Sequence, residues 1–107
     1  MHDLGSHDLG SEERDLAASL ATAIDNPADR AVFDFLIDHA GERFNGAAIA
    51  DRLGLPEHTD VGRATYRIGE ACAALGIKRP WTEAQQGYTM SPEIAELFRS
   101  VRVAIGG

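Results

Sequence analysis

The sequence predicts an α+β domain that is mainly helical and carries one small β-hairpin. Three observations lead to this fold class. Apolar residues recur at spacings of three and four along most of the chain, which is typical of amphipathic helices. Prolines and glycines separate these stretches, as they do at turns and helix ends. After Gly76 the helical spacing stops and short alternating segments begin, which indicates strands.

Length and composition favour a single globular domain. The chain has 107 residues, of which 44% are hydrophobic and 25% charged. Its net charge of -7 argues against indiscriminate binding to nucleic acid or to anionic membranes. No apolar run approaches the roughly 20 residues that a membrane-spanning helix needs, and the start lacks the features of a secretory signal. We therefore expect a cytoplasmic protein.

The N-terminal residues 1–11 hold a tandem repeat, His-Asp-Leu-Gly-Ser, and we expect them to form a flexible tail. Nothing rigid would fix the geometry of the two His-Asp pairs, so no metal site is predicted there. A single domain is expected over residues 12–105. Its first helix begins near Ser11 and has an apolar stripe formed by Leu16, Leu20 and Ile24.

Short sequence signals mark the ends of the next two helices. Asn26 is suited to cap a helix that opens at Pro27 with Asp29 in its first turn, and Gly41 ends it. A short extended segment at 42–44 leads to a compact helix introduced by Asn45 and stopped by Gly54. The apolar stripe of the earlier helix consists of Val32, Phe33, Leu36, Ile37 and Ala40.

The fourth helix, residues 60–75, has two different faces. Its buried stripe is predicted to contain Val61, Ala64, Ile68, Ala71, Cys72 and Leu75. The opposite face carries Arg63, Tyr66, Arg67 and Glu70, also at steps of three and four. Cys72 is therefore expected to be a small core residue.

A hairpin and a last helix complete the chain. Residues 77–82 are predicted to form a strand, which Pro80 confines to an edge or an irregular stretch. Residues 83–87 form a polar turn and residues 88–90 the returning strand, with Trp81 covering the core beneath the hairpin. Ser91 then caps a helix with a final apolar stripe, made of Ile94, Leu97, Phe98, Val101 and Ile105.

This order of elements resembles a winged helix-turn-helix domain with an extra N-terminal helix and a C-terminal helix. The segment 43–56, RFNGAAIADRLGLP, is similar to the strand and first helix of such regulators. The resemblance implies that helix 60–75 is the recognition helix and that hairpin 77–90 is the wing.

A second resemblance lies in the segment 87–99, GYTMSPEIAELFR, and in the helix end 70–76, EACAALG. Both look like parts of a family of small actinobacterial domains of unknown function. Those domains often carry Trp-Pro-Gly early in this helix, where the present chain has Tyr66-Arg67-Ile68. This family implies a fold and no activity.

The first hypothesis for function is a DNA-binding, transcription-regulator-like protein. Its recognition helix would present Arg63, Tyr66 and Arg67 to base edges or phosphates, and Lys78 and Arg79 would contact phosphates. The alternative is a protein–protein interaction module with an acidic surface and no DNA binding. A continuous positive band over these basic residues favours DNA, whereas interruption of the band by acids favours a protein partner.

No catalytic motif is present in the sequence. It contains neither a glycine-rich phosphate loop nor a nucleophile elbow, and its single cysteine cannot form a disulfide within the chain. We therefore expect no enzyme activity, no cofactor and no metal site. The apolar stripes of the two terminal helices must be buried, either against each other or across a homodimer interface.

Overall fold

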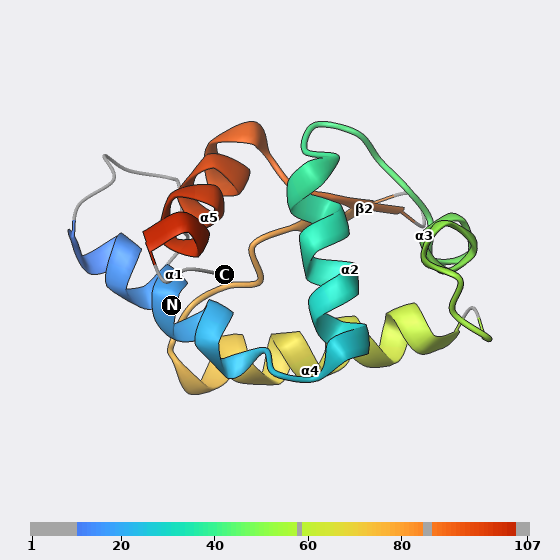
Figure 1. Ribbon diagram of the computed structural model, residues 1–107, viewed down its shortest axis with the longest axis horizontal. Helices are drawn as coiled ribbons and strands as arrows, with labels where there is room; N and C mark the ends of the chain where they lie inside the picture. The colour runs from blue at the N-terminus through green and yellow to red at the C-terminus, as the bar shows by residue number, and fades with distance from the viewer. Residues whose placement is uncertain (1–10, 58, 85–86, 105–107) are drawn as a thin grey trace.

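The computed structural model describes residues 11–57, 59–84 and 87–104. It confirms a mainly helical α+β fold with a small antiparallel sheet (Figure 1). The predictions that concern residues 1–10, residues 85–86 of the predicted turn and Ile105 lie outside the described residues. Within the described part the elements are α1 (Ser11–Ala23), α2 (Pro27–Asp38), α3 (Gly46–Leu53), α4 (Thr59–Ala74), β1 (Thr82–Ala84), β2 (Gly87–Thr89) and α5 (Pro92–Ala104).

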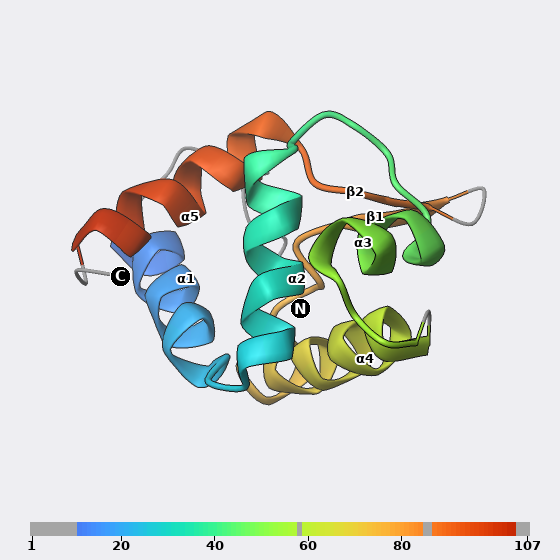
Figure 2. The ribbon, with the colours of Figure 1, turned by 45° about the vertical axis from the view of Figure 1, so that its right-hand side comes forward.

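Helix α2 stands at the centre of the molecule. Figure 2 shows α1 and α5 on one side of it, α3 and the hairpin on the other, and α4 across its lower end. Its apolar stripe is buried except at Ala40, which follows the end of α2 and is half-buried. Phe33 meets Phe98 of α5 edge to face with 4.8 Å between ring centroids. The predicted stripe is thus the centre of the core, in which Val32, Phe33, Leu36 and Ile37 are at most 2% exposed.

Side-chain caps determine where α2 and α3 begin, and the cap of α2 was predicted from the sequence. The Oδ1 atom of Asn26 accepts hydrogen bonds from the backbone amides of Ala28 at 2.9 Å and Asp29 at 3.4 Å. Asn45 caps α3 in the same way, through the amide of Ala48 at 2.7 Å. Gly54 ends α3 in the left-handed conformation, with φ at +68°, which glycine adopts without strain.

The sheet is small and has the predicted partners. β1 pairs with β2 in antiparallel register, with Glu83 opposite Tyr88. On the other side of β2, Phe44 forms an isolated antiparallel bridge with Tyr88, in which the two residues exchange backbone hydrogen bonds of 3.2 and 2.8 Å. The extended segment before α3 therefore joins the sheet, as expected.

The first strand was predicted at the wrong place. It begins at Thr82, where the sequence suggested that it would end, and Glu83 and Gly87 lie in the strands instead of in a turn. Pro80 and Trp81 are both buried, so these two residues turn inward and cover the core before the chain reaches the sheet. Proline also lacks the amide that a paired strand needs.

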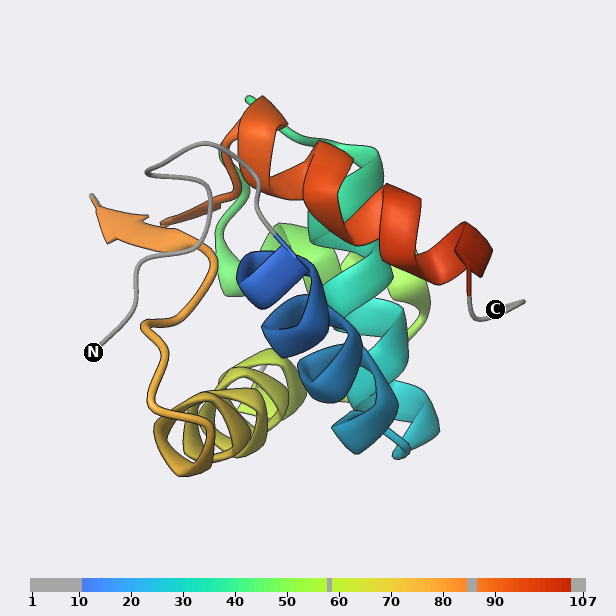
Figure 3. The same cartoon turned by 90° about the vertical axis from the view of Figure 1, so that its left-hand side faces the viewer.

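The two terminal helices pack against each other within one chain (Figure 3). Leu20 of α1, Ile24 directly after it, and Leu97, Phe98 and Val101 of α5 are each at most 5% exposed. Each stripe thus covers the other, and neither needs a second copy to be buried. Self-association through these helices stays a prediction.

Candidate functional site

Helix α4 has one buried face and one open face, as its sequence predicts. Val61, Ala64, Ile68 and Cys72 are at most 1% exposed, whereas the Arg63 side chain is 59% exposed and Tyr66 is 62% exposed. Among the described residues, Tyr66 is the one large hydrophobic residue that lies exposed. The open face of α4 is therefore the most unusual surface of the described chain.

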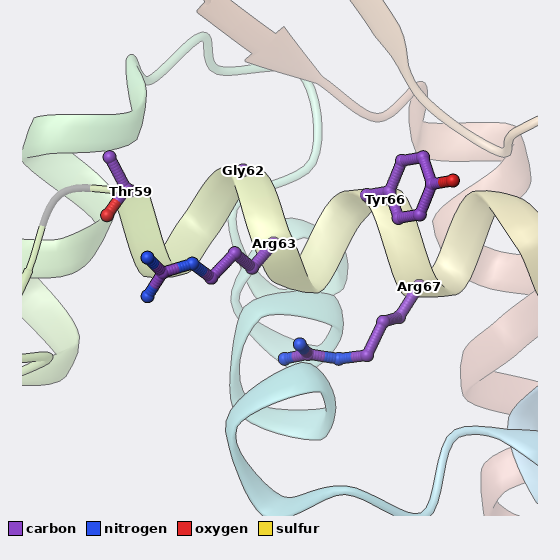
Figure 4. Close-up of a pocket in the computed structure, with 5 residues that line it drawn as sticks. All are labelled: Thr59, Gly62, Arg63, Tyr66 and Arg67. Carbon is purple, nitrogen blue, oxygen red and sulfur yellow. The ribbon is translucent and has the colours of Figure 1, made fainter.

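A shallow hollow of about 390 Å³ lies on this open face (Figure 4). A Cβ atom added at Gly62 would meet no atom within 4 Å, so the surface above this glycine is open. Figure 4 shows the side chains of Arg63 and Arg67 running toward the N-terminal end of α4, while Tyr66 extends away from them. The residues that line the hollow are Thr59, Gly62, Arg63, Tyr66 and Arg67.

Arg67 is held by a buried carboxylate on another helix. Its Nε donates to both carboxylate oxygens of Asp29, at 3.0 and 2.8 Å, and its Nη2 donates to Oδ1. Asp29 is only 5% exposed, whereas the Arg67 side chain is 48% exposed. The hydrogen bond to Asp29 is the main cause that raises the pKa of Arg67 above its usual value. The guanidinium is thus fixed on one edge and open on the other.

The sequence predicted Asp29 only as a favourable acid in the first turn of α2. Its partner lies 38 residues further along the chain, and no spacing rule connects the two positions. An acidic residue in a first turn is also so common that it gives no signal of its own. The ion pair becomes visible only once α2 and α4 are packed.

Arg63 contacts two acidic residues, one in the first turn of α4 and one just before this helix. Its Nη1 lies 3.2 Å from Oδ1 of Asp60 and 3.4 Å from Oε2 of Glu57. Tyr66 is paired in a similar way, because its hydroxyl group interacts with the carboxylate of Glu70. That hydrogen bond, followed by the negative charge, raises the pKa of Tyr66.

The two predicted wing residues lie before the hairpin. Lys78 and Arg79 belong to the segment between α4 and β1, and both are exposed. Arg79 lies across α4, since a Cβ atom added at Gly69 would be 2.6 Å from its Nε. Its Nη1 is 3.2 Å from Oε2 of Glu83. The structure therefore brings three of the five predicted site residues together on α4 and places Arg79 against the same helix.

Among the described residues, neither Cys72 nor a cluster of metal-ligating side chains adds a second site. Cys72 is 1% exposed, and burial raises the pKa of its thiol to about 11. No group of three or more potential metal-ligating side chains occurs among the residues that the structure describes. None of the helices in the described ranges is long and apolar enough to cross a membrane.

Fold and surface together define a small α+β domain whose most distinctive exposed feature is one helix face. Residues 14–105 match the model of a family of unknown function, DUF6416, and the chain belongs to this family. The prediction of a family without a known activity is thus confirmed. No curated protein and no solved structure matches the chain.

Proposed function

We propose that this chain is a protein-interaction module and that it binds its partner with the open face of α4. The exposed Tyr66, beside a hollow that two arginines border, is the observation that carries this proposal. Tyrosine and arginine are the residue types that, with tryptophan, contribute most to binding at protein interfaces. The ring of Tyr66 is 62% exposed, so most of its apolar surface is available to a partner, while its hydroxyl group is bonded to Glu70.

The distribution of charge supports a protein partner over DNA. Each arginine near α4 contacts a carboxylate of its own chain: Arg63 contacts Asp60, Arg67 contacts Asp29, and Arg79 contacts Glu83. A phosphate would meet these acids together with the arginines, in a chain whose net charge is -7. Acids thus interrupt the positive band that a DNA-binding face needs.

The Asp29–Arg67 pair gives this face a pre-arranged donor. Within the described residues the hydrogen bonds of Arg67 use Nε and Nη2, so Nη1 is free for an acceptor on a partner. A guanidinium that is already fixed loses less side-chain freedom on binding. Because Asp29 balances its charge, Arg67 suits a neutral acceptor, such as a backbone carbonyl or a hydroxyl group, as well as a charged one.

DNA binding is the second candidate. The packing of α3 against α4, with the far side of α4 open, supports it, because this arrangement resembles the helix-turn-helix unit of a winged helix. In that case Arg63, Tyr66 and Arg67 would lie in the major groove, and Lys78 and Arg79 would contact the backbone.

Photo-crosslinking from position 66 tests the proposal. Tyr66 is replaced by benzoylphenylalanine in cells of the native host, and Glu96, whose side chain on α5 is 69% exposed, is replaced in a matched control. Protein adducts that form from position 66 and not from position 96 support the proposal. Nuclease-sensitive adducts support the second candidate, and equal or absent adducts at the two positions contradict the proposed function.

A further inference from the structure

We propose that a second hollow, which lies beside Arg67 between the α1–α2 turn and α4, takes a lysine or arginine side chain of the partner protein. This inference rests on the proposed function and names the chemistry of the partner. The second hollow has a volume of about 290 Å³, and residues of the α1–α2 turn and of α4 line it. Arg67 lines both this hollow and the one beside Tyr66. A partner that covers Arg67 on the open face of α4 therefore lies next to both hollows.

The second hollow holds one carboxylate that the chain leaves unpaired. Asp25 lines it and is exposed, and among the described residues no hydrogen bond or ion pair involves its carboxylate. The carboxylate of Asp29 also lines the hollow, but it is bonded to Arg67, so these two charges balance each other. Arg30 donates to the carbonyl oxygen of Ala21 at 2.7 Å and is not part of the lining. One negative charge thus remains without a partner at this hollow.

The helix ends around the second hollow favour a cation over an anion. Pro27, the first residue of α2, has no amide hydrogen. The amides of Ala28 and Asp29 already donate to Oδ1 of Asn26, so the start of α2 has little left to offer an anion. α1 ends at Ala23 without a basic residue in its last turn, so its terminal carbonyl groups add negative partial charge. The hollow therefore offers acceptors to a positively charged group.

Apolar side chains supply much of the remaining lining. Ile24 and Ile68, each at most 5% exposed, contribute to it together with Ala23 and Ala71. Lysine and arginine lay their methylene stems along apolar surface of this kind, while their charged ends meet a polar group or water. A metal ion instead needs several ligating groups, and no cluster of three occurs among the described residues. Lining and charge together therefore fit a long basic side chain.

The two hollows together describe what the partner must present. The first hollow, beside Tyr66, offers the exposed ring to an apolar side chain, and the second offers Asp25 to a basic one. The second hollow is smaller than the roughly 300–1,000 Å³ of sites for drug-sized ligands, so it suits a single side chain. A chain with a net charge of -7 also attracts basic segments at long range. The partner segment should thus combine a basic residue with a nearby apolar one.

Selection of displayed peptides on the full chain tests this inference. A library of random peptides is panned on the immobilised protein, and peptides that no longer bind the Tyr66→Ala variant are kept. Those peptides should share a lysine or arginine, and Asp25→Asn should weaken their binding about 10-fold in isothermal titration calorimetry. Glu96→Gln removes the same charge from an exposed side chain on α5 and is the matched control, which should leave the affinity unchanged.

A double-mutant cycle then shows whether the basic residue meets Asp25. Norleucine in place of the peptide's basic residue should weaken binding to the unchanged chain about 10-fold, but binding to the Asp25→Asn variant less than about 2-fold. Independent effects of the two changes, selected peptides without a basic residue, or no selected peptide at all would overturn this inference. Peptides that require Tyr66 and ignore Asp25 would overturn it and leave the proposed function standing. Because Asp25 has no bonded partner among the described residues, Asp25→Asn should unfold at the same urea concentration as the unchanged chain.

Discussion

Arg67 on α4 and Asp29 in the first turn of α2 form a two-pronged ion pair across 38 residues of sequence. The carboxylate is buried, and the guanidinium is half exposed on the open face of α4. One interaction therefore holds two helices together and also orients a donor on the proposed binding surface. Replacement of the arginine and replacement of the acid should therefore lower the free energy of unfolding by different amounts.

Removal of the arginine should destabilise the fold more than removal of the acid. Arg67→Met leaves a buried carboxylate without its partner, which should lower the free energy of unfolding by about 2–4 kcal/mol. Asp29→Asn leaves a guanidinium that water can reach, so the loss should be about 1–2 kcal/mol. Urea denaturation measures both, and an equal or larger loss for Asp29→Asn would show that the pair is not buried on the acid side.

Glycine replacements should have opposite effects at two positions. Gly62→Ala adds a methyl group in open space on a helix and should raise the free energy of unfolding by about 0.5–1 kcal/mol. Gly54→Ala forces a side chain into a left-handed conformation with φ at +68° and should lower it by about 1 kcal/mol. Thermal denaturation of both variants tests these signs, and stabilisation by Gly54→Ala would contradict the observed end of α3.

The side chain of Asn26, which caps α2, should stabilise the fold about as much as other N-terminal helix caps do. Asn26→Ala removes the acceptor for two backbone amides and should cost about 1 kcal/mol, whereas Asn26→Asp keeps an acceptor and should cost little. Chemical denaturation compares the two. Equal losses for alanine and aspartate would mean that Asn26 does not act through its side-chain oxygen.

Cys72 should be unreactive in the folded chain. Its pKa is raised from 9.0 to about 11, so at pH 8 the thiolate fraction is about 100-fold smaller than for an ordinary thiol. Because the folded state favours the protonated thiol, this stabilisation is complete below about pH 9 and is lost as the pH rises toward 11. Reaction with a thiol reagent should be slow until urea unfolds the chain, and rapid labelling under native conditions would contradict its burial.

Local signals made the helices predictable, and tertiary packing determined the rest. Asn26 and Asn45 mark helix starts through bonds to amides two or three residues away, so a single sequence reveals them. The start of β1 could not be read in this way, because the burial of Pro80 and Trp81 depends on the core that they cover.

In the candidate site, too, local spacing predicted one part and tertiary packing determined the other. The face with Arg63, Tyr66 and Arg67 follows from helical spacing alone, and the structure confirms that these residues lie together. The acids that pair with them were not predicted as partners. Asp29 approaches from another helix, and Arg79 contacts α4 only because the chain folds back after Ala74. The carboxylates of Asp60, Asp29 and Glu83 each pair with an arginine near α4. These pairs favour a protein over DNA as the partner.

The most direct test of that balance is a titration of the isotope-labelled chain with duplex DNA of mixed sequence at 50 mM salt, followed by NMR. The side-chain Nε–H signals of Arg63 and Arg67 and the ring signals of Tyr66 report on the open face of α4. If this face binds protein, these signals should stay unchanged at about 100 µM DNA, where even non-specific DNA binding would be visible. Shifts that are confined to these residues and that weaken steeply as salt is raised would contradict the account and establish α4 as a DNA-binding helix.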